Sequence, residues 1–197
     1  MTTGTVVAGH GGQGVLELAN WLAYYHLRKG RHVAFTPSYG PETRGGKVKC
    51  YVVESDDPID SPIVEEPDLL IVMNIPSMDY LPLLKRGGTL VVNRSLVTET
   101  HGRPDVTVVE VPATALAAGL GRYVPEEGRD PSIAANSVML GAVLATEHES
   151  WSAERERVEG VFRHFLTDRK AAYIPLNLAA VEAGFASVAP PLRAPAL

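Results

Sequence analysis

The segment that decides the fold reads TVVAGHGGQGV and spans residues 5–15. Its first four residues, Thr5 to Ala8, form a short apolar run with β-branched side chains, which favours a β-strand. After the glycines, apolar side chains recur every three to four residues as far as His26, which is typical of one face of a helix ending near Lys29. A strand that passes through a glycine-rich turn into a helix predicts an α/β fold.

The rest of the chain continues this alternation. Further strands are predicted at residues 32–36, 47–54, 68–74, 89–93 and 105–111, and helices at 76–84, 113–120, 133–146, 152–166 and 176–188. The first helix connects the first two strands, which we interpret as a β-α-β unit. The strand at 68–74 is continuously apolar, as strands covered on both faces are. We therefore expect an α/β, Rossmann-like layered sandwich, with a mainly parallel sheet and helices on both faces.

Length and composition predict a single domain. The chain has 197 residues, of which 45% are hydrophobic and 21% charged, as in soluble globular proteins. We assign residues 1–188 to one α/β domain and residues 189–197 to a Pro-rich C-terminal tail. No apolar run approaches the roughly 18 to 20 residues that a membrane span needs. The first residues also lack the pattern of a secretory signal. We expect a cytoplasmic protein with no membrane partner.

Cysteine content and charge exclude further classes. The single cysteine, Cys50, excludes an intramolecular disulfide, and also an all-cysteine iron–sulfur or zinc site built from this chain alone. The net charge of −5 argues against nucleic acid as a partner. Residues 1–50 nevertheless carry six Lys or Arg residues against two acids, and this basic segment is also the most glycine-rich.

The glycine loop fits a dinucleotide-binding fingerprint, with Gly9, Gly11 and Gly14 at the spacing G-x-G-x-x-G. That fingerprint also requires an acidic residue at the end of the second strand to hold a ribose hydroxyl, and residues 35–38 contain none. NAD binding is therefore disfavoured. Two interpretations remain, one in which the glycines only let the helix pack close to the sheet, and one in which they admit a ligand. Gln13 favours the second, because its amide can bind a ligand or orient the next loop.

A second loop, PSYGPETRGG, covers residues 37–46 and leaves the carboxyl end of the second strand, the edge at which α/β sheets bind ligands. It places Arg44 beside glycines, and Lys47 follows. Arginine can bind a phosphate or a carboxylate through two parallel hydrogen bonds. The alternative is a surface loop whose arginine is merely solvated.

Together, the two loops resemble the gamma subunit of 2-oxoacid:acceptor (ferredoxin) oxidoreductases, the family that acts on pyruvate, 2-oxoglutarate, ketoisovalerate or phenylglyoxylate. The likeness continues through SDDPIDSP at 55–62, KRGGTL at 85–90 and NSVMLGA at 136–142. The resemblance implies oxidative decarboxylation of a 2-oxoacid to an acyl-CoA, carbon dioxide and two low-potential electrons. Thiamine diphosphate supplies the carbon chemistry in that family, and iron–sulfur clusters carry the electrons.

The resemblance further implies that this chain is one subunit of a hetero-oligomer. It has neither the Gly-Asp-Gly…Asn motif of a thiamine diphosphate–magnesium site nor the cysteines of a cluster. Thiamine diphosphate, magnesium and 4Fe–4S clusters are therefore expected in thiamine-binding and ferredoxin-like partner subunits. We assign no catalytic residue and no metal ligand to this chain. Its expected roles are complex architecture and part of the site for coenzyme A, the co-substrate.

The positions that match the family's coenzyme A region lie in the two loops. They are Gly9, Gly11, Gly12, Gln13, Gly14, Tyr39, Arg44, Gly45, Gly46 and Lys47. Arg44 can instead hold its loop against a partner subunit. Two other functions stay open, a free-standing nucleotide-binding (NAD-type) dehydrogenase or regulatory domain, and a purely architectural subunit.

Other polar residues have competing interpretations. His26 falls on the apolar stripe of the first helix and is expected to be a packing residue, and Cys50 an inert buried thiol. Asn74 and Asn93 each end a buried strand, where they either line a cleft or cap the strand end. Asn136, early in a helix of small residues, either caps that helix or faces a partner.

Overall fold

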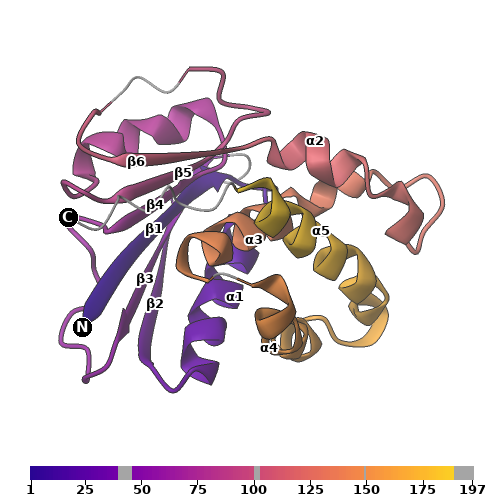
Figure 1. The fold of residues 1–197 in the computed structure, drawn as a ribbon, viewed down its shortest axis with the longest axis horizontal. Coiled ribbons are helices and arrows are strands. Elements are labelled where there is room, and N and C mark those ends of the chain that lie inside the picture. The colour runs from indigo at the N-terminus through magenta and orange to yellow at the C-terminus, as the bar shows by residue number, and fades with distance from the viewer. Residues whose placement is uncertain (40–45, 100–102, 149, 189–197) are drawn as a thin grey trace.

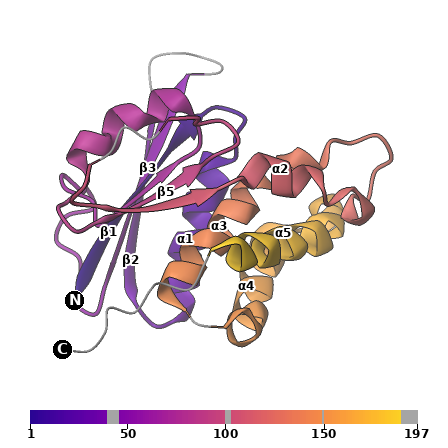
Figure 2. The ribbon, with the colours of Figure 1, turned by 45° about the horizontal axis from the view of Figure 1, so that its top comes forward.

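The computed structural model (Figures 1 and 2) describes residues 1–39, 46–99, 103–148 and 150–188 of the 197-residue chain. A twisted sheet occupies one side of the molecule, and most of the helices lie on the other side. The tail predicted at 189–197 lies outside the described residues.

The sheet has six strands in the spatial order β2-β3-β1-β4-β5-β6. The strands are β1 (Thr2–His10), β2 (His32–Tyr39), β3 (Lys47–Ser55), β4 (Leu69–Val72), β5 (Thr89–Asn93) and β6 (Thr107–Val111). β1, β4, β5 and β6 pair in parallel, whereas β3 is antiparallel to both β1 and β2. The prediction of a mainly parallel sheet is confirmed.

The first β-α-β unit differs from the expectation in one respect. The helix α1 (Val15–Arg28) does connect β1 to β2, and these two strands run in the same direction. β3 lies between them, because the chain turns back from β2 and forms an antiparallel pair with it before β3 joins β1. The end of β2 is therefore one strand further from the glycine loop than it is in a dinucleotide-binding unit with neighbouring strands.

Helices cover the two faces of the sheet unequally. Besides α1, the α-helices are α2 (Ala113–Ala118), α3 (Ala135–Glu147), α4 (Trp151–Phe165) and α5 (Ile174–Ser187), and the 3₁₀ helices are η1 (Ile75–Leu83), η2 (Gly121–Tyr123), η3 (Pro131–Ala134) and η4 (Asp168–Tyr173). All five α-helices contribute to one hydrophobic core, whereas η1 covers the opposite face, as Figure 2 shows. Helices on both faces were predicted correctly. The helix expected at 133–146 starts two residues later, at Ala135, since η3 precedes α3.

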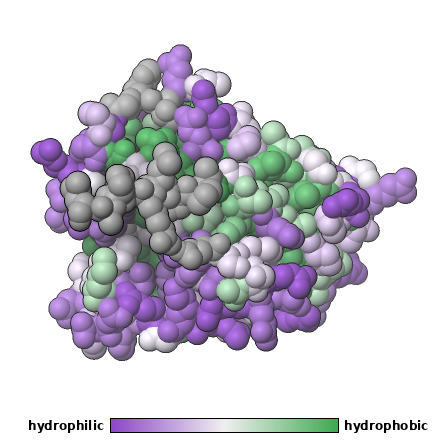
Figure 3. Space-filling model, viewed as in Figure 1, coloured by the Kyte–Doolittle hydropathy of each residue, from purple (hydrophilic) through white to green (hydrophobic). Residues whose placement is uncertain are grey.

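Alternation along the strands divides the apolar side chains between two cores. In β4, Leu69 and Ile71 face the α-helices, while Leu70 and Val72 face η1. Because all four are buried, the continuous apolar run is explained by a strand covered on both sides. In Figure 3, hydrophilic residues gather over α4, and more apolar ones lie over α2 and α5.

The α3 and α5 helices cross in close contact at two glycines. A Cβ atom on Gly141 would lie 1.9 Å from the carbonyl oxygen of Val181, and one on Gly184 would lie 1.9 Å from that of Val138. Only glycine lets the two backbones approach this closely. The crossing fixes α5 against α3, and these helices carry the polar residues at the floor of the cleft described next.

Candidate ligand-binding cleft

The two loops singled out in the sequence meet at one edge of the sheet. His10 at the end of β1 is the register partner of Lys47 at the start of β3. The backbone N–H of Gly11 donates to the carbonyl oxygen of Gly46, with an N···O distance of 3.1 Å. This edge also holds the carboxyl ends of the parallel strands, where α/β sheets bind ligands. The fold therefore brings the glycine loop and the end of the second loop together.

The glycines of the first loop have different roles. A Cβ atom on Gly9 would lie 2.6 Å from Val15 Cγ2, and one on Gly14 would lie 2.2 Å from Asn136 Nδ2. At these two positions glycine allows close packing, as the packing interpretation requires. Gly12 has a φ of +94°, and no atom lies within 4 Å of the place where its Cβ would be. The backbone at Gly12 is therefore open to a ligand.

Gln13 braces the loop from within. Its side-chain Oε1 accepts hydrogen bonds from the backbone N–H of His10 at 2.8 Å and from Asn74 Nδ2 at 2.6 Å. Asn74 Oδ1 in turn accepts from the backbone N–H and the hydroxyl of Ser77, which caps the start of η1. Gln13 thus orients the loop that contains it.

The N-terminus of α1 presents backbone donors without a side-chain acceptor. Its N-cap residue is Gly14, in a left-handed conformation with φ 70° and ψ 27°, and no side chain caps the first turn. The first turns of helices expose N–H groups and the positive end of the helix dipole. A helix N-terminus of this kind favours an anionic ligand group.

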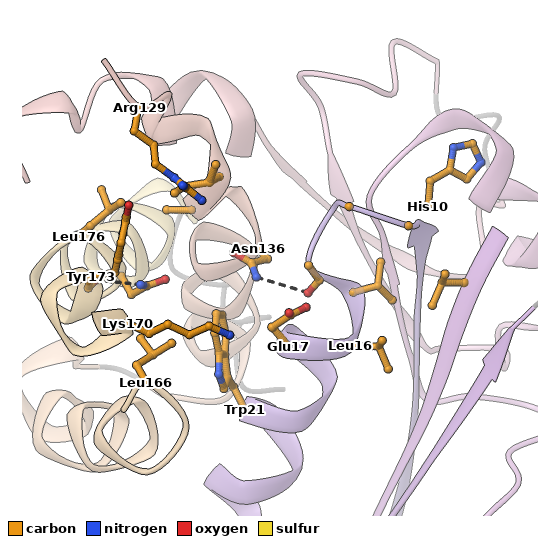
Figure 4. A pocket seen from close by; sticks show the side chains of 18 residues that line it. His10, Leu16, Glu17, Trp21, Arg129, Asn136, Leu166, Lys170, Tyr173 and Leu176 are labelled. Atoms are coloured by element: carbon orange, nitrogen blue, oxygen red, sulfur yellow. Dashed lines mark hydrogen bonds between the residues drawn. The ribbon is translucent and has the colours of Figure 1, made fainter. Parts of the chain in front are cut away.

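A cleft of about 480 Å³ opens in front of this turn, between α1 and the segment from η2 to α5 (Figure 4). One wall is formed by the glycine loop, the start of α1 and Val48, and the other by residues from the second half of the chain. The lining residues are His10, Gly11, Gly12, Gly14, Val15, Leu16, Glu17, Trp21, Val48, Arg129, Ile133, Ala134, Asn136, Leu166, Lys170, Tyr173, Leu176 and Asn177. An apolar cleft with a few polar groups is typical of a small-molecule site.

A chain of hydrogen bonds runs along the floor of the cleft. Asn136 Nδ2 donates to the carbonyl oxygen of Gly14 at 3.3 Å, and Asn136 Oδ1 accepts from the backbone N–H of Ser137 at 2.9 Å. The Ser137 hydroxyl donates to Asn177 Oδ1 at 2.5 Å, and Asn177 Nδ2 donates to the carbonyl oxygen of Tyr173 at 2.8 Å. These side chains are buried, so the bonds tie both walls of the cleft together.

Charged side chains of both signs line the cleft. Arg129 and Lys170 extend into it from the wall opposite α1, and Glu17 faces them from the first turn of α1 (Figure 4). The Arg129 guanidinium lies 5.5 Å from the centre of the Tyr173 ring and 3.5 Å from Glu126 Oε2. No salt bridge is formed by Lys170 within the part of the chain that the structure describes.

The structure separates the predicted basic residue from this cleft. Lys47 extends from the η1 face of the sheet, where its Nζ lies 2.7 Å from Asp79 Oδ2. Lys49, on the same face of β3, lies over the rings of Tyr51 at 5.2 Å and Tyr80 at 5.0 Å. Val48 lies between them in sequence and faces the α-helices and the cleft, because side chains alternate along a strand.

The other predicted site residues are placed as follows. Gly11, Gly12 and Gly14 line the cleft. Gly9, Gln13 and Gly46 support its loop through the contacts given above. The backbone of Tyr39 pairs with Val48 at the end of β2. Arg44 and Gly45, and the side chain of Tyr39, lie outside the described residues.

Sequence reasoning missed the residues of the second wall. Arg129 comes from the connection between η2 and η3, Lys170 and Tyr173 from η4, and Asn177 from α5, all more than 100 residues after the glycine loop. No motif or spacing links them to that loop, so no signal within the sequence could have found them.

The remaining residues with competing interpretations have structural roles. Asn93 is fully buried, donates to Thr114 Oγ1 at 3.0 Å and accepts from the backbone N–H of Ser95 at 3.2 Å, so it caps the end of β5. His26 is buried, and burial lowers its pKa to about 4. Cys50 is also buried, and burial raises the pKa of its thiol to about 11. Both predictions, a packing histidine and a buried thiol, are confirmed.

The described residues contain neither a metal-type cluster nor a helix suited to a membrane. Among them, no group of three or more His, Cys, Asp or Glu side chains is arranged to hold a metal ion. Among the same residues, no helix combines the length and the apolar character that crossing a membrane requires.

Comparison with known proteins identifies the relatives of this chain. The family model described as pyruvate ferredoxin/flavodoxin oxidoreductase matches residues 4–187. The ketoisovalerate oxidoreductase subunit VorA of Methanothermobacter marburgensis is 34% identical over 180 residues, which are 90% of this chain and 35% of VorA. The chain thus spans about a third of the length of that relative.

In two further matches, the alignment covers most of this chain and most of the relative. The 2-oxoglutarate synthase subunit KorC of the same organism is 38% identical over 161 residues, 78% of this chain and 82% of KorC. The crystal structure of a keto/oxoacid ferredoxin oxidoreductase gamma subunit from Geobacter sulfurreducens superposes with a TM-score of 0.72 at 28% identity, covering 94% of this chain and 97% of that one.

Proposed function

Because the chain belongs to the pyruvate ferredoxin/flavodoxin oxidoreductase family, we propose that it is the gamma subunit of a thiamine diphosphate-dependent 2-oxoacid:acceptor oxidoreductase. The complex cleaves the bond between the carboxylate and carbonyl carbons of a 2-oxoacid, releasing carbon dioxide. The acyl group forms a thioester with coenzyme A, and two electrons pass to the acceptor. Thiamine diphosphate, magnesium and 4Fe–4S clusters belong to the thiamine-binding and ferredoxin-like partner subunits in this proposal. The complex is cytoplasmic in the same proposal.

This chain contributes the architecture of the complex and part of the coenzyme A site, and carries no redox centre. The observation that carries the proposal is the open glycine loop at the N-terminus of α1, which faces a cleft that the fold has already formed. The phosphates of coenzyme A are anions of the kind that helix N-termini bind. Gly11, Gly12 and Gly14 provide the backbone approach, and Gln13 holds their loop in place.

The second loop completes the proposed region. Tyr39 and Gly46 stand at the two ends of the connection that contains Arg44 and Gly45. Gly46 contacts Gly11 directly, which supports the assignment of this loop to the same edge as the cleft. Lys47 acts in this proposal from the η1 face, either on the ligand or on a partner subunit.

The sheet topology argues against a free-standing NAD-type domain. In that class, the end of the second strand lies beside the glycine loop and supplies a carboxylate for the ribose. Here β3 separates β2 from β1, and β2 ends in Pro37-Ser38-Tyr39. The end of β2 therefore neither lies beside the glycine loop nor offers a carboxylate to a ribose hydroxyl.

Affinity purification of the tagged full chain from its source tests the proposal. We expect thiamine diphosphate- and cluster-bearing subunits to co-purify, and the preparation to reduce a low-potential acceptor only when a 2-oxoacid and coenzyme A are both present. A chain that purifies alone and binds NAD tightly contradicts the proposal.

A further inference from the structure

The two cations of the cleft stand opposite the N-terminus of α1. Arg129, between η2 and η3, and Lys170, on η4, extend from the far wall into the cleft on the side facing α1 (Figure 4). Among the described residues, Lys170 forms no salt bridge, and Arg129 has only the 3.5 Å contact with the exposed Glu126. A ligand in the cleft therefore meets backbone N–H donors on one side and two positive charges on the other.

The spacing of these groups is fixed by the buried floor. Asn136, Ser137 and Asn177 connect the carbonyl of Gly14 to that of Tyr173, and Tyr173 is the last residue of η4, which also carries Lys170. Asn136 and Asn177 are only 6% and 8% exposed, and Ser137 is fully buried. Buried and satisfied hydrogen bonds of this kind hold a site in its binding geometry before the ligand arrives.

We propose that Arg129 and Lys170 bind phosphate groups of coenzyme A in this cleft, opposite the glycine loop. This inference rests on the proposed function and adds the residues that supply its positive charge, which come from the second half of the chain. Arg129 can donate two parallel hydrogen bonds to a phosphate, and Lys170 acts as a point charge. Buried apolar side chains such as Trp21 and Leu176 line the cleft beside these two exposed cations.

Glu17 sets the balance of charge in the same cleft. Its carboxylate lies in the first turn of α1 and lines the cleft beside the proposed phosphate position. A carboxylate repels a phosphate, so Glu17 weakens the site that the two cations form. Removal of a positive charge and removal of this negative charge must therefore change phosphate affinity in opposite directions.

The test compares three charge variants in the purified complex. We expect Arg129→Gln and Lys170→Gln each to raise the KM for coenzyme A about tenfold, as expected for a lost charge-assisted hydrogen bond. Glu17→Gln is expected to lower it about threefold, as expected for removal of a partly screened repulsion. Matched controls are Arg169→Gln, beside Lys170 on η4, and Arg122→Gln on η2, neither of which lines the cleft.

Ligand variants separate lost phosphate contacts from a damaged fold. The same comparison is made with 3′-dephospho-coenzyme A and with pantetheine, which has no phosphate. The KM for pantetheine should not change in any variant, and a variant that loses its effect with the dephospho ligand acts on the 3′-phosphate. Equal effects on pantetheine and coenzyme A, or unchanged kinetics in both cation variants, overturn the inference.

A failure of the proposed function gives a different result. If the tagged chain captures no partner subunits, that function fails, and calorimetric titration of the full chain with coenzyme A then decides the inference. Binding that weakens about tenfold in Arg129→Gln and Lys170→Gln supports it. Absent or unchanged binding overturns it.

Discussion

The glycine crossing of α3 and α5 gives the sharpest test of the packing. Replacement of Gly184 by alanine places a Cβ atom 1.9 Å from the carbonyl oxygen of Val138 and 2.8 Å from its carbonyl carbon. Close carbon–oxygen contacts in proteins are about 3.3 Å, so the atoms must move apart by roughly 1.4 Å. Both groups belong to helix backbones and cannot rotate away. The helices themselves must therefore separate.

The expected loss of stability in Gly184→Ala is the difference between an overpacking cost and a gain in helix propensity. Overpacking of a well-packed core costs about 1–3 kcal/mol, and the upper end applies because the clash involves backbone. Alanine in place of a helical glycine returns about 1 kcal/mol. We expect Gly184→Ala to lower the free energy of unfolding by roughly 2 kcal/mol, which is a fall in Tm of about 4–8 °C for a chain of this size.

Gly141 lies at the other contact of the crossing, and a Cβ atom there would lie 1.9 Å from the carbonyl oxygen of Val181, so Gly141→Ala should have a similar cost. Once the helices have separated for one substitution, the second costs less. The double variant should therefore lose less stability than the two single variants together, because the sites share one contact. Separation should also weaken the hydrogen bond between Ser137 and Asn177, which crosses from α3 to α5 below the cleft.

Gly160, within α4, is the matched control. The three atoms nearest to a Cβ there all belong to the guanidinium of Arg28, the closest at 3.1 Å, and that exposed side chain can move. Gly160→Ala should therefore gain about 0.5–1 kcal/mol from helix propensity. The measurement is urea unfolding of the three single variants and the double variant, monitored by far-UV circular dichroism. A Gly184→Ala variant as stable as the wild type would show that the two helix backbones are not in this close contact.

Three further predictions follow from the polar and buried groups. Gln13→Met leaves the donors of His10 and Asn74 without an acceptor and should cost roughly 2 kcal/mol in urea unfolding, whereas Gln13→Glu keeps the acceptor and should cost less; equal losses contradict the brace. His26, with its pKa lowered to about 4 by burial, stays neutral in the folded chain while the unfolded chain takes up a proton below pH about 6.5. The free energy of unfolding should therefore decrease by up to roughly 3 kcal/mol as the pH is lowered from 6.5 to 4, and His26→Gln should remove that part of the pH dependence. Parallel curves of stability against pH for the variant and the wild type would exclude this contribution of His26. Cys50 is fully buried with its pKa raised to about 11, so Ellman's reagent should label the native chain only after unfolding, and rapid labelling in native buffer would disprove the buried thiol.

The strands and helices could be predicted because each is encoded by local patterns. The run at 68–74 and the stripe from Val15 to His26 report burial through periodicity alone, and the structure places β4 and α1 there. The position of β3 between β1 and β2 could not be predicted in this way. Pairing of strands depends on backbone hydrogen bonds between distant segments, and side-chain periodicity within each segment does not encode them.

Some residues of the candidate site could likewise be predicted from local sequence, and others could not. The glycine loop could be recognised because its residue types and spacing are local and specific to a tight turn before a helix. Lys47 was grouped with that loop because it is close in sequence, and the alternation of β3 places its side chain on the η1 face instead. The individual roles of Gly12, which is open, and Gly14, which packs against Asn136, also require the neighbours to be known.

The fold class, the glycine loop and the family resemblance can be recognised from the amino-acid sequence alone, because each depends on short stretches whose chemistry acts on adjacent residues. Which charges share the cleft depends on tertiary packing. It places Arg129 and Lys170 opposite the start of α1 and moves Lys47 to the other face of the sheet. The physical reason is that a cleft forms between packed elements, so its two walls come from segments that only the close crossing of α3 and α5 and the buried floor around Asn136 bring together.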